Sequence, residues 1–240
     1  TDTMKSILVT GATSGIGKAF ALHAANAGYR VIACGRNMQA LAELSKNSNI
    51  DTLQFDVTDL EQTNKALGDT TFDIAVLNAG TCEYVDLPEF DPALFKRVFE
   101  VNFFGIVNCI HALLPKCGKN TQLVIIDSMA RLLPFTRSEA YGASKAAVHY
   151  LTQSLSVDLR AKGVIVQSVS PGFVETPLTD KNDFEMPMKI TAEEAAETLL
   201  KRIEAKQMAI YFPNVFGWIL RILNHLPQRI KRWLSSKLQQ

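Results

Sequence analysis

The sequence is poor in cysteine, and its cysteines are not placed for disulfide or metal chemistry. Cys34, Cys82, Cys109 and Cys117 are the only four among 240 residues, and they form no Cys-x-x-Cys pair and no cluster with histidine. The four histidines show no metal-binding spacing either, and we assign them no role. This usage is typical of a reducing compartment, so we expect free thiols, no metal site and a cytoplasmic location.

The sequence also lacks an excess of charge and a targeting segment. Its formal net charge is +1 and charged residues make up 20% of the chain, so we expect no nucleic-acid partner. No basic stretch followed by an apolar segment and a small-residue cleavage site opens the chain, and we expect no signal peptide. Met4 is a candidate natural start, with Thr1–Thr3 a remnant in front of it.

What the sequence does have is an alternation of short apolar runs with longer amphipathic stretches. Hydrophobic residues make up 47% of the chain, which is ample for the core of one large α/β domain. The predicted strands are Ser6–Thr10, Arg30–Ala33, Thr52–Phe55, Ile74–Leu77, Gln122–Ile126, Val164–Val169 and Ala209–Phe212. The predicted helices cover residues 15–27, 37–47, 59–67, 91–114, 139–162 and 192–206. This alternation predicts a parallel sheet covered on both faces, with ligands at the carboxyl ends of its strands.

A glycine-rich turn, TGATSGIG, follows the first predicted strand and opens the first predicted helix. Gly11 allows a tight turn, Gly15 lets the backbone approach a pyrophosphate, and Gly17 lets the helix pack on the sheet. The helix N-terminus adds free N–H groups and a partial positive charge, which suits phosphate binding. The spacing is G-x-x-x-G-x-G rather than G-x-G-x-x-G, and such a turn by itself could be a plain strand-to-helix connection.

Tyr141 and Lys145 lie one helical turn apart in YGASK and therefore on the same face of a helix. Ser128 closes the fifth predicted strand, at the edge where ligands of parallel sheets bind. We expect the lysine charge to lower the pKa of the phenol toward neutrality and make it a usable proton donor. A lone Tyr-x-x-x-Lys is common on solvated helices, but its combination with Ser128 and the glycine turn predicts hydride transfer coupled to proton transfer.

Five motifs in order carry a family resemblance: TGATSGIG, NAG at 78–80, Ser128, YGASK and PGFVET. From residue 5 to about residue 212, the chain resembles a short-chain dehydrogenase/reductase of the common single-domain type. The resemblance implies a Rossmann-like, doubly wound parallel sheet of about seven strands, with helices on both faces and one nucleotide site. We expect one catalytic domain over 1–213, with an appended tail over 214–240.

The resemblance also implies a catalytic set of Asn102, Ser128, Tyr141 and Lys145. In the family, the tyrosine protonates the substrate oxygen that the serine holds, and the lysine binds the nicotinamide ribose. The asparagine interrupts its helix locally and anchors a water that is relayed to the lysine.

The end of the second strand indicates which nucleotide binds. Gly35 stands where NAD-preferring family members carry an aspartate, and the guanidinium of Arg36 can bind a 2′-phosphate. We therefore predict NADP(H), with NAD(H) less favoured. The predicted cofactor-binding set is Gly11, Thr13, Ser14, Gly15, Ile16, Gly17, Arg36, Asp56, Val57, Asn78, Ala79, Gly80, Tyr141, Lys145, Pro171, Gly172, Val174 and Thr176.

The substrate pocket is expected to come from Met129–Phe135, Phe173 and a flap at 177–190. Because these segments are largely apolar, they favour a lipophilic small-molecule substrate. Arg131 and Arg137 could recognise an acid, although solvated loop arginines are the commoner case.

The last segment, 215–238, carries five basic residues and no acidic residue. Ile230, Trp233, Leu234 and Leu238 fall on one helical face, yet the segment is too short and interrupted to span a bilayer. Two interpretations stay open. The tail lies on an anionic membrane surface or covers the substrate entrance, or it packs on its own domain or a partner subunit.

The sequence thus predicts an NADP(H)-dependent carbonyl reductase or alcohol dehydrogenase. One alternative is an NADP(H)-sensing binding protein on the same fold without turnover, and another is a lyase or epimerase with bound cofactor. The family implies a homodimer built by helices 91–114 and 139–162. The protein is expected to be cytoplasmic. Whether it also contacts a membrane peripherally through 215–238 is left open by the sequence.

Overall fold

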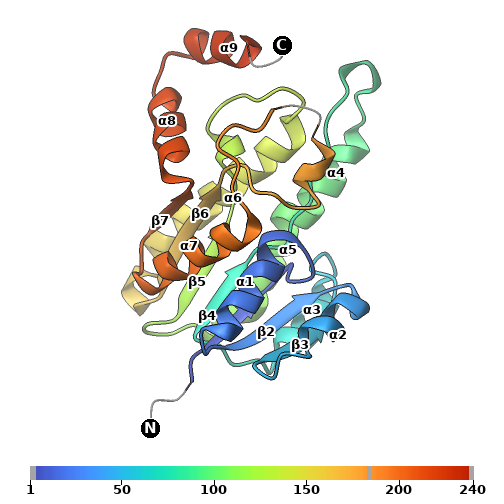
Figure 1. The fold of residues 1–240 in the computed structure, drawn as a ribbon, viewed down its shortest axis with the longest axis vertical. Helices are drawn as coiled ribbons and strands as arrows, with labels where there is room; N and C mark the ends of the chain where they lie inside the picture. Colours follow the sequence, from blue (N-terminus) through green and yellow to red (C-terminus); the bar gives the residue numbers. More distant parts are fainter. Residues whose placement is uncertain (1–3, 183–184, 238–240) are drawn as a thin grey trace.

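The computed structural model describes residues 4–182 and 185–237. The proposed remnant Thr1–Thr3, two residues of the predicted flap (183–184) and Leu238 lie outside the described residues. Seven strands form one sheet in the order β3-β2-β1-β4-β5-β6-β7 (Figure 1). They are β1 Ser6–Val9, β2 Arg30–Gly35, β3 Ile50–Gln54, β4 Ile74–Leu77, β5 Gln122–Ile126, β6 Ile165–Pro171 and β7 Ala209–Phe212. Every pairing is parallel, which confirms the predicted doubly wound sheet.

Helices cover both faces of the sheet (Figure 1). They are α1 Gly15–Asn26, α2 Met38–Leu44, α3 Leu60–Leu67, α4 Pro92–Phe99, α5 Gly105–Leu113, α6 Glu139–Asp158, α7 Ala192–Glu204, α8 Asn214–Asn224 and α9 Gln228–Lys237. On β1, Ile7 and Val9 pack in the core beneath α1 and α7, whereas Leu8 packs in the core beneath α5 and α6. This double burial is why the strands are continuously apolar. The strand order reverses beside β1, and the sheet therefore opens a crevice at the carboxyl ends of β1 and β4.

The predicted helix at 91–114 is continuous but changes its winding. A π-helical turn, Glu100–Phe104, lies between α4 and α5 and contains Asn102, where the family resemblance implies an interruption. Among the described residues, Pro92–Lys116 is the helix long and apolar enough to cross a membrane, which is weak evidence by itself. Its residues Ile106, Ile110 and Leu113 pack in the core against the sheet.

The tail forms two helices, α8 and α9, separated around Pro227. On α8, Phe216 and Leu220 are buried in a separate apolar cluster with Met129, Leu132 and Tyr211. The inner face of α8 therefore packs on its own domain, as one of the two interpretations of the tail expects. The division of the chain at residue 213 stays a prediction.

Candidate active site

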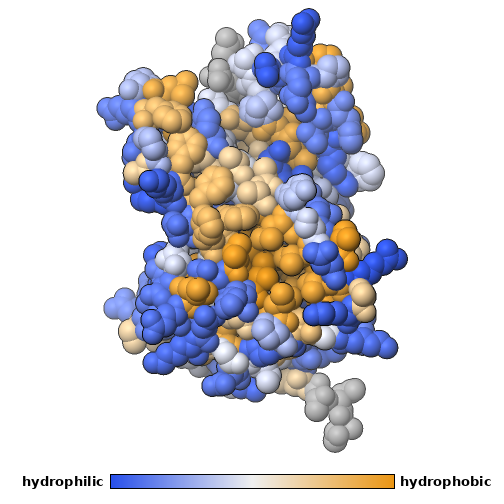
Figure 2. Space-filling view, turned by 180° about the vertical axis from the view of Figure 1, so that it is seen from behind, coloured by the Kyte–Doolittle hydropathy of each residue, from blue (hydrophilic) through white to orange (hydrophobic). Residues whose placement is uncertain are grey.

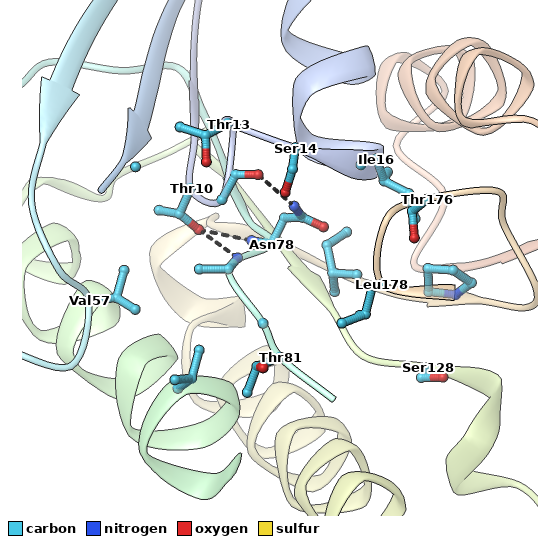
Figure 3. A pocket seen from close by; sticks show the side chains of 18 of the residues that line it. Thr10, Thr13, Ser14, Ile16, Val57, Asn78, Thr81, Ser128, Thr176 and Leu178 are labelled. Atoms are coloured by element: carbon cyan, nitrogen blue, oxygen red, sulfur yellow. Dashed lines mark hydrogen bonds between the residues drawn. The ribbon is translucent and has the colours of Figure 1, made fainter. Parts of the chain in front are cut away.

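A cavity of about 400 Å³ lies at the carboxyl ends of the central strands (Figure 3). Of the predicted catalytic and cofactor-binding residues, all line this cavity except Gly17 and Asn102. Pro177, Leu178 and Thr179 line it too, and they belong to the flap predicted at 177–190. The sequence analysis missed Thr10, Cys34, Phe55, Thr81, Val101, Ile126 and Asp127, which also line it. Several of these directly adjoin a predicted residue, so extending each motif by one residue would have found them.

The glycine turn is held at the phosphate end of the cavity. Gly15 has a positive φ of 58°, which favours glycine. A Cβ on Gly17 would lie 2.1 Å from the Gly11 carbonyl oxygen, so no side chain fits there. The hydroxyl of Thr10 accepts hydrogen bonds from the backbone N–H groups of Asn78 (2.9 Å) and Ala79 (3.2 Å), which ties the turn to the end of β4 (Figure 3).

Tyr141 and Lys145 share this cavity with Ser128, as the motif spacing predicts. The Lys145 ammonium lies 5.8 Å from the centre of the Tyr141 ring, and the phenol is hydrogen-bonded to the Ser128 side chain. The Ser128 hydroxyl also accepts from the backbone N–H of Ala130 at 3.0 Å, which fixes its orientation at the end of β5. The three groups therefore lie together on one part of the cavity wall.

The electrostatic expectation for this pair is wrong in direction. Burial raises the pKa of Tyr141 well above its ordinary value, and the hydrogen bond from Ser128 opposes this only in part. Burial lowers the pKa of Lys145 to about 8, while the nearby Asp127 carboxylate acts in the opposite direction. For both groups desolvation by burial is the largest cause of the pKa shift, because burial penalises the charged form.

Asn102 is fully buried next to the cavity and not on its wall. Its Oδ1 accepts from the backbone N–H of Thr81 at 2.7 Å, and its Nδ2 donates to the Thr81 carbonyl (2.9 Å) and the Ser144 hydroxyl (3.0 Å). A Cβ on Gly80 would meet Asn102 Oδ1 at 3.3 Å and Lys145 Nζ at 3.4 Å, so the three residues are packed together. Asn102 thus holds the loop after β4 against the helix that carries Lys145; the water relay implied by the family stays a prediction.

A buried polar network lies behind Ser128, and the sequence analysis missed it. Asp127 has a fully buried carboxylate that lies 3.0 Å from His149 Nδ1 and 3.4 Å from Arg131 Nε, and it accepts from the Ser170 hydroxyl. The guanidinium of Arg131 also donates to Ser170 (3.1 Å) and to the Tyr211 hydroxyl (2.9 Å). Arg131 is therefore not a solvated loop arginine, and His149 has a structural partner.

The end of the cavity where the family resemblance implies the adenosine is lined by Arg36, which is exposed, and by Asp56. The Asp56 carboxylate accepts from the backbone N–H (2.9 Å) and hydroxyl (2.8 Å) of Thr58. A Cβ on Gly35 would lie 2.4 Å from Thr13 Cγ2, so the glycine turn and the end of β2 approach too closely for a side chain in the present arrangement.

The end of the cavity where the family resemblance implies the nicotinamide is bounded by Pro171, Gly172, Val174 and Thr176. A Cβ on Gly15 would meet Thr176 Cγ2 at 3.3 Å, which shows that the residue just before the predicted flap contacts the glycine turn. The segments predicted for the substrate pocket divide between two cavities. Pro177, Leu178 and Thr179 of the flap line this cavity. Leu132, Leu133, Pro134 and Phe135 line a second cavity of about 850 Å³. Met129 and Phe173 pack in the apolar cluster under α8.

The comparisons with known proteins agree with this geometry. The short chain dehydrogenase family matches residues 5–187, which is most of the chain. The chain belongs to the short-chain dehydrogenase family. It is 34% identical to a serine 3-dehydrogenase of Rhizobium radiobacter over 213 residues, covering 81% of this chain and 86% of that protein.

Two solved structures of other proteins have a fold similar to that of this chain. An actinorhodin polyketide ketoreductase with NADPH is 25% identical, with a TM-score of 0.76 over 87% of this chain and 95% of that one. A short chain dehydrogenase from Burkholderia cenocepacia in complex with NADP is 24% identical, with a TM-score of 0.85 over 99% of this chain and 98% of that one. The protein is thus an oxidoreductase of the short-chain dehydrogenase family, as its motifs predicted.

Proposed function

We propose that this short-chain dehydrogenase is an NADP(H)-dependent enzyme that interconverts a carbonyl compound and the corresponding alcohol. The observation that carries the proposal is that Ser128, Tyr141 and Lys145 line the same cavity as the glycine turn. A cofactor at the turn and a substrate oxygen at the tyrosine would therefore meet in one space.

The residues of this cavity fit a nicotinamide dinucleotide. The turn before α1 has no room for side chains at Gly17, and the N-terminus of α1 offers N–H groups to a pyrophosphate. The exposed guanidinium of Arg36 at the cavity edge supports binding of a 2′-phosphate, and no carboxylate follows β2 to repel it. The NADPH bound to the ketoreductase relative supports the same preference.

The nicotinamide, when bound, supplies or accepts the hydride. In reduction, Ser128 holds the substrate oxygen and the Tyr141 phenol gives it a proton. Because burial raises the pKa of Tyr141, the phenol stays protonated at neutral pH and has a proton to donate in this step. Lys145, when charged, stabilises the phenolate that remains and binds the nicotinamide ribose, and Asn102 positions the helix that carries the lysine.

The substrate is proposed to be a lipophilic small molecule. Val101, Pro177 and Leu178 line the cavity that holds Tyr141, and they are apolar. The serine 3-dehydrogenase relative acts by its name on a small polar amino acid, so a screen should include both classes.

The experiment is to follow NADPH absorbance with wild type and Tyr141→Phe, supplying NADPH with a panel of ketones and aldehydes and NADP+ with a panel of 3-hydroxy acids. The proposal expects turnover with at least one compound and a loss of about a hundredfold or more in Tyr141→Phe, because the proton donor is gone. NADPH binding without turnover on the whole panel would favour the alternative, an NADP(H)-sensing protein. Equal rates of both proteins on every active compound would reject the catalytic assignment.

We also propose that the enzyme is a cytoplasmic homodimer formed by α5 and α6. Phe104 (47%), Tyr150 (77%) and Val157 (73%) are strongly exposed on these helices and the π-turn before α5. Figure 2 shows a broad apolar area on the face opposite to α1 and α7, where these helices lie. Light scattering should give twice the chain mass, and Tyr150→Asp/Val157→Asp should give the single mass with intact NADPH binding.

A further inference from the structure

The last helix, α9, buries two polar residues and exposes two large apolar ones among its charged residues. Ile230 and Trp233 are 43% and 59% exposed, whereas Lys231 and Ser235 are 9% and 7% exposed. A helix that only packs on its own domain shows the opposite arrangement. Within the described residues, the Ser235 hydroxyl has no hydrogen-bond partner, so burial of this side gains little.

The inward position of Lys231 has a clear cause. Its ammonium donates to the backbone carbonyl of Asn224 at 3.0 Å, and Asn224 is the last residue of α8. The lysine therefore neutralises the carbonyl end of α8, where a positive charge is favourable. This contact fixes the rotation of α9 and leaves Ile230 and Trp233 pointing to solvent.

The preceding helix, α8, is apolar on two sides. Its inner residues Phe216 and Leu220 are buried in the domain. Its outer residues form a second stripe at spacings of three and four, with exposures of 44–61%: Val215, Trp218, Ile219 and Ile222. Packing in the domain explains why the inner residues are apolar, but it does not explain why the exposed outer residues are apolar.

Trp218 is held in place on this outer stripe. The guanidinium of Arg221 lies 4.4 Å from the centre of the Trp218 ring and 4.1 Å from the centre of the Tyr211 ring. The indole is therefore fixed on a buried tyrosine through a cation between two rings. A side chain ordered in this way loses little conformational entropy when it enters a new environment.

The charges around the two stripes have one sign. No aspartate or glutamate follows Glu204 in the sequence, and Arg229, Arg232 and Lys237 are exposed on α9. A symmetric contact between two copies through this face would bring these cations together with no carboxylate on either helix to pair with them. The charge therefore fits an anionic partner with an apolar interior.

We propose that α8 and α9 bind the surface of an anionic phospholipid bilayer. The two helices leave the edge of the sheet after β7 and stand at one end of the molecule, where both are accessible (Figure 1). They are 11 and 10 residues long, or about 16 Å each against about 30 Å of hydrocarbon, so they lie in the interface and do not span it. Tryptophan and isoleucine enter the acyl boundary while the arginines and lysine meet the headgroups.

Trp218 and Trp233 are the only two tryptophans of the protein, so its tryptophan emission reports on these helices alone. The experiment adds vesicles of phosphatidylcholine, with or without about a third phosphatidylserine, to the full-length protein. It then measures co-sedimentation, tryptophan emission and quenching by brominated lipid. We expect binding to the anionic vesicles only, a blue shift, quenching, and weaker binding at high salt.

Three variants sharpen this test. Trp218→Ser/Trp233→Ser should weaken vesicle binding by at least about tenfold, and Arg229→Gln/Arg232→Gln/Lys237→Gln by about a hundredfold. The matched control is Met38→Ser/Met208→Ser, which replaces two residues that are 67% and 56% exposed outside the tail and should bind as wild type. Retained NADPH binding shows that each variant is folded.

Several outcomes would overturn the proposal. One is no sedimentation with anionic vesicles, and another is sedimentation with unchanged tryptophan emission, since the contact would then lie elsewhere. A third is a larger mass without lipid that disappears in Trp218→Ser/Trp233→Ser, because the stripes would then be covered by a second copy. None of these outcomes depends on catalysis, so the proposed function is tested separately.

Discussion

A buried ion pair joins Asp127 to Arg131, whose Nε atom lies 3.4 Å from Asp127 Oδ1. The two side chains are 0% and 9% exposed, and Asp127 directly precedes the candidate catalytic Ser128. Through His149 and Ser170, the same carboxylate links α6 to β6. The candidate site is thus built on a buried charge network that holds the ends of two strands and one helix together.

Removing one partner of this ion pair should be costly. Arg131→Met should lower the free energy of unfolding by about 3–5 kcal/mol, because it leaves the Asp127 carboxylate buried without its guanidinium partner. Urea denaturation measures the change. The control is Arg131→Met/Asp127→Asn, which should be more stable than the single variant because no unpaired charge remains. A single variant within about 1 kcal/mol of wild type would show that the pair does not matter for folding.

Loss of the Asn102 amide should affect stability more than loss of a comparable amide nearby. Asn102→Ala removes three hydrogen bonds to Thr81 and Ser144 at a fully buried position, and we expect a loss of about 2–4 kcal/mol. The matched control is Asn108→Ala, which removes one hydrogen bond to the Val57 carbonyl and should lose about 1 kcal/mol. Thermal unfolding of both variants checks the order, and a reversed order would contradict it.

Nucleotide preference should depend on Arg36. Arg36→Gln should weaken NADPH binding by about tenfold to a hundredfold, since a charge-assisted contact contributes about 1.5–3 kcal/mol. NADH affinity should change by about twofold or less, because NADH has no 2′-phosphate. Fluorescence titration measures both constants, and a parallel loss for the two nucleotides would assign Arg36 a general rather than a selective role.

Conversion to NADH should require two substitutions and not one. Gly35→Asp alone introduces a Cβ that meets Thr13 Cγ2 at 2.4 Å, so it should disturb the glycine turn and weaken both nucleotides. Thr13→Ala/Gly35→Asp removes the obstructing methyl group and should bind NADH more tightly than Gly35→Asp does. Equal NADH affinity in the two variants would show that the turn adjusts without help.

The pH dependence of NADPH binding should reveal Lys145. Its pKa is lowered to about 8 from 10.5, so the ammonium is charged below about pH 8 and neutral above. Affinity for NADPH should therefore fall as pH rises through about 8, because a charged donor binds ribose hydroxyls more strongly than a neutral amine. Lys145→Met should bind weakly with no such step, and a step of the same size in that variant would assign it to another group.

The same shift predicts a stability change in the protein without nucleotide. Between about pH 8 and pH 10.5 the unfolded chain keeps the Lys145 proton and the folded chain does not. The unfolded state binds more protons in this window, so the lysine's contribution makes the folded state more stable as pH rises through it. Comparing urea midpoints of wild type and Lys145→Met across the window checks the sign.

The elements that the sequence predicted well are those decided by local pattern. The apolar runs gave all seven strands, since strands covered on both faces have no polar side. The winding of the helix around Asn102 followed from the family resemblance alone, because no periodicity marks a π-turn. In the tail, the sequence placed Ile230, Trp233 and Leu234 on one helical face, and all three lie on α9, while α8 precedes Pro227 as a separate helix.

The ion pairs and pKa shifts of the site could not be predicted from the sequence, because they depend on contacts between residues far apart in the chain. From the sequence alone, Arg131 was interpreted as a loop residue. In the fold, β6 and β7 place Ser170 and Tyr211 within hydrogen-bonding distance of its guanidinium. The pKa of Tyr141 was expected to fall, yet its burial, which the spacing in YGASK does not encode, raises it. Motifs therefore located the groups, and only the packing around them determined their protonation.

The stacking of Phe216 on Phe173 makes the tail difficult to study by deletion. The two rings lie 5.8 Å apart, and a Cβ on Gly172 would meet Phe216 at 2.9 Å, directly behind the nicotinamide end of the cavity. Cutting the chain before Asn214 would uncover Met129, Leu132 and Leu133 and leave the cofactor wall unsupported. A shortened protein would then be expected to aggregate or lose nucleotide for reasons unrelated to lipid, whereas changes confined to the solvent side of α8 leave that wall intact.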